Sequence, residues 1–221
     1  MGVYAGGSYA LGNYVPGTSD LDVAAVVRAP MSRSLLAATV EAIRHEALPC
    51  PARGLEFVLY PLDVARAGTT EAGFLLNVNT GAGIPFRVDL DAAGVERHWF
   101  PIDRGIYAEH GVALSGPPAA DVFAPAPRRE LLPLLVESLE WHAPGSARGA
   151  DVVLNAARSL RYGLEGTWSS KHDAGQWVLE RLGPDDAVAQ ALAARSGGTD
   201  VDPYEADRFR LSVLARLRDE A

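Results

Sequence analysis

Two aspartates near the start of the chain have the spacing needed to bind a metal ion. Asp20 and Asp22 are separated by one residue, and an apolar run follows them over residues 23–27. If this segment is a strand, both side chains point to the same side, because side-chain direction alternates along a strand. Adjacent carboxylates repel one another, and a hard cation such as Mg²⁺, carrying nucleotide phosphates as further ligands, would offset that repulsion.

A glycine-rich turn, Gly6-Gly7-Ser8, precedes the aspartates, with Ser8 twelve positions before Asp20. A backbone without Cβ lets amide groups approach phosphate oxygens closely, so we predict that Gly7 and Ser8 bind phosphate. Either motif alone is weak, because Asp-x-Asp also occurs at solvated strand ends. Together they resemble the nucleotidyltransferases related to DNA polymerase β, in which Gly-Ser precedes a strand bearing Asp-x-Asp.

A third carboxylate, Glu56, interrupts an otherwise apolar segment over residues 55–60. Burying an unpaired carboxylate is costly, so this side chain needs a partner or faces a site. In a nucleotidyl-transfer site it would act as a metal ligand or as the general base on an attacking hydroxyl. The alternative is a solvent-facing glutamate on an edge strand.

Composition restricts the class of protein. The chain has 221 residues, of which 48% are hydrophobic and 22% charged, and no apolar run reaches the length of a membrane span. We therefore expect a cytoplasmic protein with no membrane partner, and the single cysteine, Cys50, excludes an internal disulfide. The net charge of −8 disfavours nucleic acid as a partner and suits a small cationic substrate.

Two domains are predicted: an α/β (α+β) nucleotidyltransferase domain with a mixed sheet over residues 1–123, and an all-α helical bundle over residues 124–221. Strands are predicted at 3–5, 21–27 and 55–60, with a possible strand at 86–90 and a helix over 32–48. Residues 61–127 are rich in glycine and proline and show no other clear pattern. Helices of the second half are predicted at 129–141, 151–163, 171–182, 185–195 and 204–218, with start signals at Ser170 and at Asp202-Pro203.

Further segments extend the resemblance over nearly the whole chain. Beyond Gly6-Gly7-Ser8, Asp20-Leu21-Asp22 and Leu55-Glu56, they are residues 110–117, 151–158 (Asp-Val-Val-Leu-Asn-Ala-Ala-Arg), 170–171 and 174–182. In these the chain resembles the aminoglycoside 3″-adenylyltransferase family, the streptomycin and spectinomycin resistance enzymes. The resemblance implies transfer of AMP from ATP to an antibiotic hydroxyl, with Mg²⁺ as cofactor.

The resemblance also implies roles for single residues. Asp20 and Asp22 would bind Mg²⁺, Glu56 would contact the substrate as general base, and Arg158 and Lys171 would hold the ATP phosphates. From the residues alone, Lys171 lies near a helix N-terminus, where a cation opposes the helix dipole, and this favours a phosphate partner. Arg158 could equally form a buried ion pair. Asp151 is either an N-terminal helix charge or a contact to a cationic drug.

Two departures from the family bear on the substrate. Members that accept streptomycin carry a tryptophan in the middle segment and an acidic residue just before the Val-Val-Leu helix. The closest equivalents here are Asn79 and Arg148. A buried guanidinium at Arg148 would face the guanidinium groups of streptomycin as a like-charge contact. Spectinomycin, or a different hydroxyl-bearing compound, is therefore expected to be a better substrate than streptomycin. The family also has a helix before the first strand, so a piece of the first domain is either missing or dispensable.

Two alternatives remain open at this stage. The acceptor of the nucleotidyl group could be a protein side chain or a metabolite. The chain could also bind a nucleotide without turnover, although the third carboxylate argues against this, because binding alone needs no general base. We expect a monomer.

Overall fold

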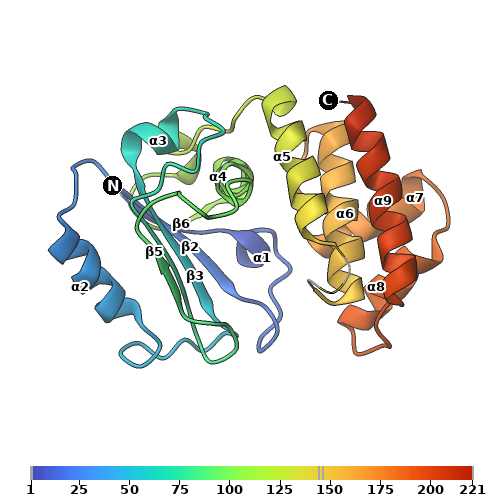
Figure 1. Ribbon diagram of the computed structural model, residues 1–221, viewed down its shortest axis with the longest axis horizontal. Coiled ribbons are helices and arrows are strands. Elements are labelled where there is room, and N and C mark those ends of the chain that lie inside the picture. The colour runs from blue at the N-terminus through green and yellow to red at the C-terminus, as the bar shows by residue number, and fades with distance from the viewer. Residues whose placement is uncertain (1, 144, 146, 221) are drawn as a thin grey trace. The chain divides into compact units, whose positions relative to one another are not determined.

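The chain divides into two compact units. A computed structural model describes residues 2–143, 145 and 147–220, and its units are Met1–Ala126 and Pro127–Ala221 (Figure 1). Unit 1 combines a sheet with helices, and unit 2 consists of helices. The division falls within the Ala-Pro tract, residues 124–127, where the sequence changes character.

Unit 1 is organised around a mixed sheet, as predicted. Its strands are β1 (Gly2–Ala5), β2 (Leu21–Val27), β3 (Leu55–Pro61), β4 (Leu76–Thr80), β5 (Arg87–Asp89) and β6 (Val112–Ser115). Their order across the sheet is β5-β4-β3-β2-β1-β6. The pair β2 and β3 is parallel, whereas every other neighbouring pair is antiparallel.

One face of the sheet is covered by α2 (Arg33–Ile43). Leu36 and Val40 of this helix pack with strand residues such as Phe57 and Val78, and Ser32 caps its start by accepting from the Leu35 amide at 3.2 Å. The helix was predicted to run over residues 32–48 but ends at Ile43. Beyond it, the amide of His45 donates to Thr80 Oγ1 at 2.8 Å, outside the helical hydrogen-bond pattern.

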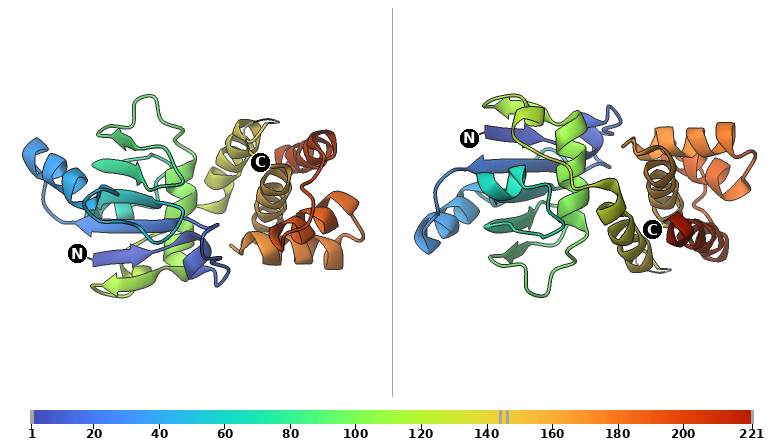
Figure 2. Two further views of the ribbon diagram at one scale, coloured as in Figure 1. Left: turned by 90° about the horizontal axis from the view of Figure 1, so that it is seen from below. Right: turned by 90° about the horizontal axis from the view of Figure 1, so that it is seen from above.

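The opposite face is covered by α4 (Trp99–His110), and Figure 2 shows α2 and α4 on the two sides of the sheet. Phe100 and Tyr107 pack with Tyr4 and Tyr60 in a buried cluster. Arg104, which is 1% exposed, fixes α4 to the segment after α3 (Leu62–Arg66). Its guanidinium donates to the carbonyl oxygens of Thr69 (2.8 Å), Glu71 (2.6 Å) and Ala72 (2.8 Å).

Two short helices complete unit 1. The first, α1 (Gly7–Ala10), lies between β1 and β2 in the chain, and the 3₁₀ helix η1 (Ala119–Asp121) follows β6. The amide of Gly6 donates to the carbonyl of Asp22 at 2.8 Å, which ties the start of α1 to the start of β2.

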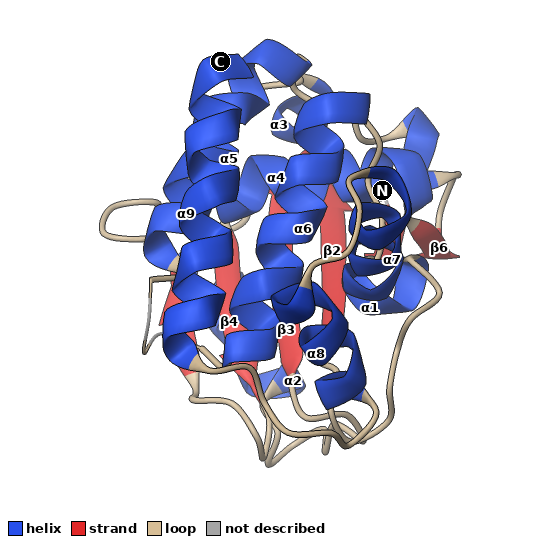
Figure 3. Cartoon of the chain, turned by 90° about the vertical axis from the view of Figure 1, so that its right-hand side faces the viewer, coloured by secondary structure: helices blue, strands red, loops and turns tan. Residues whose placement is uncertain are grey.

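Unit 2 consists of α5 (Arg128–Trp141), α6 (Gly149–Glu165), α7 (Lys171–Arg181), α8 (Asp186–Arg195) and α9 (Pro203–Glu220). The central helix is α6, with α9 on one side and α7 and α8 on the other (Figure 3). Each of these helices was predicted to within two residues at both ends, and the predicted start signals are confirmed. Ser170 accepts from the Asp173 amide at 3.1 Å, and Asp202 accepts from the Tyr204 amide at 2.9 Å. No helix in the described ranges is long and apolar enough to cross a membrane.

Candidate active site

The register of β2 and β3 places two acidic side chains next to each other. Asp22 is directly opposite Glu56, and on the other side of β3 Glu56 is opposite Asn79 of β4. Residues opposite one another on neighbouring strands project from the same face of a sheet. Ala24 and Tyr60, two and four positions further along these strands, belong to the cluster under α4, so this polar row lies on the α4 face.

Gly7 leaves the space that the Asp22 carboxylate occupies. Its φ is +48°, in the left-handed region, and a Cβ built there would overlap the Asp22 Oδ2 and Cγ atoms. A side chain at this position would therefore meet both backbone strain and a steric clash. Ser8 follows in α1 and is half-buried. The prediction that Gly7 and Ser8 bind phosphate stays a prediction.

Asp20 is held by a cation that the sequence analysis missed. Arg53 Nε donates to Asp20 Oδ1 at 2.7 Å, and Arg53 Nη2 donates to Asp20 Oδ2. The ladder of β2 and β3 extends backwards to bring these residues together, with the amide of Arg53 donating to the carbonyl of Ser19. The repulsion expected between the two aspartates is thus offset in part by a guanidinium.

Glu56 has the properties expected of a proton acceptor. Burial, together with the negative charges of Asp22, Asp20 and Asp103, raises its pKa from 4.5 to about 8, and Arg53 opposes this increase. A raised carboxyl pKa in a cluster of acids is typical of functional sites, although ion-pair networks in structural positions also produce it.

Two residues of α4 belong to the same neighbourhood. Burial, Asp22 and Asp103 raise the pKa of Tyr107 well above its usual value. The ring of Tyr107 also lies against Gly6, where an added Cβ would be 2.6 Å from Cε1. Asp103 and Tyr107 were not predicted as site residues, because the sequence showed no clear helical pattern over residues 99–110.

The acidic residues fit a metal ion that brings its own phosphate ligands. In the part of the chain that the structure describes, no three His, Cys, Asp or Glu side chains are grouped to hold a metal ion by themselves. Mg²⁺ commonly takes only one or two carboxylates and completes its octahedral shell with water and phosphate oxygens. Asp20 and Asp22, with the space left by Gly7, suit a Mg²⁺ ion that takes two carboxylates from the protein and its other ligands from water and phosphate.

In unit 2 the predicted residues Lys171 and Asp151 form an ion pair. Lys171 Nζ lies 2.8 Å from Asp151 Oδ1. Burial lowers the pKa of Lys171 and the charges of Arg158 and Arg195 lower it further, against the opposite effect of Asp151. Burial raises the pKa of Asp151, but Lys171, Arg195 and Arg148 outweigh it and hold that pKa below the usual value. Three cations therefore surround one carboxylate here.

The other predicted residues of unit 2 also have partners. Arg158 is half-buried, and its Nη2 donates to Asn155 Oδ1 at 3.4 Å within α6. Arg148 was predicted as a buried guanidinium facing the substrate; its side chain is instead 58% exposed, and it lies 3.6 Å from Asp200 Oδ2. Asp200 in turn accepts from the amides of Gly149 and Ala150, and so caps α6.

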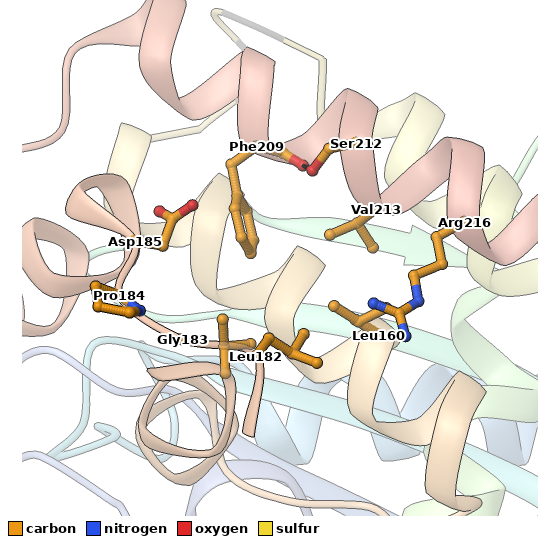
Figure 4. A pocket seen from close by; sticks show the side chains of 10 residues that line it. Leu160, Leu182, Gly183, Pro184, Asp185, Phe209, Ser212, Val213 and Arg216 are labelled. Carbon is orange, nitrogen blue, oxygen red and sulfur yellow. Dashed lines mark hydrogen bonds between the residues drawn. The ribbon is translucent and has the colours of Figure 1, made fainter. Parts of the chain in front are cut away.

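A pocket of about 250 Å³ lies elsewhere in unit 2 (Figure 4). Its apolar lining includes Leu160, Phe209 and Val213, with the polar groups of Asp185 and Arg216 also facing it. None of the residues predicted from the sequence to bind substrate or phosphate lines this pocket, so it is separate from the ion pair of Lys171 and Asp151.

Comparisons with known proteins match the two halves of the chain to two different family descriptions. Residues 2–71 match the family described as Nucleotidyltransferase domain, and residues 121–216 match Aminoglycoside adenylyltransferase, C-terminal domain. A curated relative from Klebsiella pneumoniae, Aminoglycoside (3'') (9) adenylyltransferase, is 38% identical over 77 residues. That match covers 34% of this chain and 29% of the relative. A relative of the same name from Rhizobium radiobacter is 35% identical over the same extent.

A solved structure shares the fold. It is the spectinomycin adenyltransferase AAD(9) from Enterococcus faecialis, determined with ATP and spectinomycin. The TM-score is 0.67 at 16% sequence identity, and the match covers 99% of this chain and 91% of that chain. The predicted fold class, a mixed-sheet nucleotidyltransferase domain followed by a helical domain, is confirmed.

The space at Gly7 can be tested against a matched glycine. Gly7→Ala should weaken the binding of Mg-ATP by at least about tenfold in calorimetric titrations, because the added methyl displaces the Asp22 carboxylate. Gly12→Ala is the control, since Gly12 also has a positive φ, of +70°, but a Cβ there would have no neighbour within 4 Å. Equal affinities for the two variants would contradict the assignment of Gly7 to the site.

The raised pKa of Glu56 predicts a pH-dependent effect on stability in metal-free buffer. The folded protein holds the Glu56 proton more tightly than the unfolded chain, so this group costs nothing below pH 4.5. It destabilises the fold progressively as the pH rises from 4.5 to about 8. Glu56→Gln should therefore raise the Tm at pH 9, by at least about 5 °C, and change it little at pH 4.5. Scanning calorimetry with the exposed Glu71→Gln variant as control checks this, and a Tm difference independent of pH would contradict it.

Proposed function

We propose that the chain transfers AMP from Mg-ATP to a hydroxyl group of an aminoglycoside or aminocyclitol, as its matches to the nucleotidyltransferase domain and to the aminoglycoside adenylyltransferase C-terminal domain support. In this reaction the hydroxyl oxygen loses its proton to a general base and forms a bond to the α-phosphorus of ATP. The bond between the α-phosphorus and the oxygen that bridges it to the β-phosphorus breaks, and pyrophosphate leaves. The observation that carries the proposal is the register of β2 and β3, which sets Glu56 directly beside Asp22.

Asp20 and Asp22 are the residues that would hold Mg²⁺, which when bound supplies positive charge to the ATP phosphates. Arg53 fixes the Asp20 carboxylate through two hydrogen bonds, so the orientation of that side chain is set before substrate binds. Gly7 keeps clear the space around Asp22, and the amides of Gly7 and Ser8 are the candidate donors to phosphate oxygens.

Glu56 is proposed as the general base. A sugar or cyclitol hydroxyl is a poor nucleophile until its proton is removed, and a base with a pKa near the working pH accepts that proton most effectively. In the metal-free protein, burial and the neighbouring carboxylates raise the Glu56 pKa to about 8, so this carboxylate is a stronger base than an ordinary one. Arg158 and Lys171 are proposed to bind the ATP phosphates from unit 2, where Asp151 fixes the position of the Lys171 ammonium group.

Spectinomycin is proposed as a better acceptor than streptomycin. Asn79 occupies the position at which streptomycin-accepting members carry a tryptophan. It is opposite Glu56 in the sheet, which supports a place for Asn79 near the acceptor hydroxyl. Arg148 places a positive charge where those members carry an acidic residue. Streptomycin has two guanidinium groups of its own, so this charge disfavours it.

The reaction itself is tested by measuring pyrophosphate release from ATP and Mg²⁺ with a panel of acceptors. Release that depends on an aminoglycoside or aminocyclitol, together with an adenylylated product in the mass spectrum, is the expected result. Release with none of these acceptors would contradict the proposed function.

Charge-removing substitutions test the metal assignment. Asp20→Asn and Asp22→Asn should each lower kcat by a factor of about 10² or more, because an amide is a much weaker ligand for Mg²⁺ than a carboxylate. Circular dichroism should show an unchanged fold, and the exposed Asp63→Asn should retain the parent's kcat. Near-normal Mg²⁺-dependent turnover in both variants would end this assignment.

Replacing Glu56 by glutamine separates a base from a ligand. Glu56→Gln keeps the shape and removes the basicity, so kcat should fall by about 10²–10⁴-fold while ATP and acceptor bind with nearly the parent's affinity. Steady-state kinetics and calorimetry measure the two quantities. Loss of Mg-ATP binding with unchanged turnover at saturation would make Glu56 a metal ligand instead.

Substrate preference is tested by kcat/KM for the two antibiotics in matched assays. We expect spectinomycin to be favoured, and Arg148→Gln to raise kcat/KM for streptomycin by a few-fold, because the like charge is removed at an exposed position where its effect is screened. The same substitution should change the spectinomycin value little. Faster adenylylation of streptomycin by the parent would refute the preference.

A further inference from the structure

A series of hydrogen bonds in unit 2, buried except at the last step, leads to Arg158. The carbonyl oxygen of Ser138 lies 2.7 Å from His142 Nδ1, His142 Nε2 lies 2.8 Å from Asn155 Nδ2, and Asn155 Oδ1 lies 3.4 Å from Arg158 Nη2. His142 is 5% exposed and Asn155 is 7% exposed. The series, here called the His142 network, connects the end of α5 with α6.

The chemistry of its two ends fixes the direction of every hydrogen bond in the His142 network. A carbonyl oxygen can only accept, so His142 Nδ1 must carry a proton and donate to Ser138. A guanidinium can only donate, so the Asn155 atom that faces Arg158 must be the amide oxygen. The Asn155 amide nitrogen then donates to His142 Nε2, which requires a neutral imidazole protonated at Nδ1 alone.

The packing around α5 holds His142 in place. The backbone amide of His142 donates to the same Ser138 carbonyl at 3.1 Å. One turn away, the carbonyl of Leu139 accepts from Arg210 Nη1 of α9 at 3.0 Å, and Arg210 is itself only 6% exposed and hydrogen-bonded to Asp207. Asn155 is therefore supported by an imidazole that has little freedom to move.

We propose that His142 and Asn155 are positioning residues that orient the guanidinium of Arg158 for phosphate. This rests on the proposed function, in which Arg158 binds the ATP phosphates. An arginine side chain loses much rotamer freedom when it binds a ligand, and a hydrogen bond that restricts it beforehand reduces that loss. The direction of the hydrogen bonds in the His142 network suits this role, because Asn155 Oδ1 is an acceptor and the guanidinium of Arg158 can only donate.

A double-mutant cycle tests the positioning role. His142→Leu and Asn155→Leu should each raise the Kd of Mg-ATP by about tenfold in calorimetric titrations, as expected for losing support of a charged hydrogen-bonding group. In an Arg158→Ala background the same substitutions should add no further loss, because their effect passes through Arg158. Additive losses would overturn the proposal.

Two further variants separate positioning from general destabilisation. Val153→Ala removes volume from the buried face of α6 at a position that is neither three nor four residues from Asn155 or Arg158, and should lower the Tm while leaving the Kd of Mg-ATP near the parent's value. His142→Gln can return an acceptor to the place of Nε2, and should recover part of the affinity lost in His142→Leu. A Kd that follows Tm across all variants would mean a merely structural role and would overturn the proposal.

The nucleotide-free protein gives a readout that does not depend on the proposed function. Long-range ¹⁵N–¹H spectra should show His142 protonated at Nδ1 and not at Nε2, and the Arg158 Nε–H vector should become more mobile in Asn155→Leu. The Nε2-protonated form, or unchanged Arg158 mobility, would overturn the proposal even if Mg-ATP binds normally. If the unmutated protein bound no Mg-ATP, the proposed function would be contradicted. The spectra alone would then test whether the His142 network restricts the Arg158 side chain.

Discussion

The parallel register between β2 and β3 is the constraint on which the rest of unit 1 depends. It sets Asp22 opposite Glu56, and a shift by one residue would turn one of these side chains to the α2 face of the sheet. Adjacent carboxylates in a partly buried place cost free energy, which is visible in the raised pKa of Glu56. Gly7, which leaves room for Asp22, and Arg53, which pairs with Asp20, are local features that accommodate this arrangement.

The apolar layers on both faces of the sheet make such an arrangement tolerable. Alternation along β2 and β3 sends Val23 and Phe57 to the α2 side and Ala24 and Tyr60 to the α4 side, so each strand is buried on both faces beyond the acidic residues. Arg104 anchors α4 through three backbone carbonyls, which fixes the helix that carries Asp103 and Tyr107 beside the acids. Packing in the core therefore keeps the acidic residues close together, although their mutual repulsion acts to separate them.

Local sequence signals predicted most of the elements, whereas contacts between distant segments were not predictable. The strand at 21–27 and the capped helices of unit 2 follow from alternation and from Ser170 and Asp202, which act within a few residues. The alternating Leu76-Asn77-Val78-Asn79-Thr80 segment could have revealed β4, but the surrounding glycines and prolines obscured it, and Pro101 and Gly105 interrupt the helical signal of α4. Arg53 and Asp103 reach the acids only through strand register and helix packing, so no spacing in the sequence points to them.

The same limit applies to Lys171, whose position at a helix N-terminus predicted an unfavourable charge. The structure shows that Asp151, twenty positions earlier, pairs with it, and yet burial and the neighbouring Arg158 and Arg195 keep the Lys171 pKa below its usual value. The surroundings of Lys171 thus still disfavour its positive charge, just as the surroundings of Glu56 disfavour its negative one. Within unit 2, an anionic group beside Lys171 would reduce the cost of its charge, and within unit 1 a cation beside Asp20 and Asp22 would reduce that of Glu56. Each unit therefore carries its own electrostatic requirement for a ligand, and the two requirements are opposite in sign.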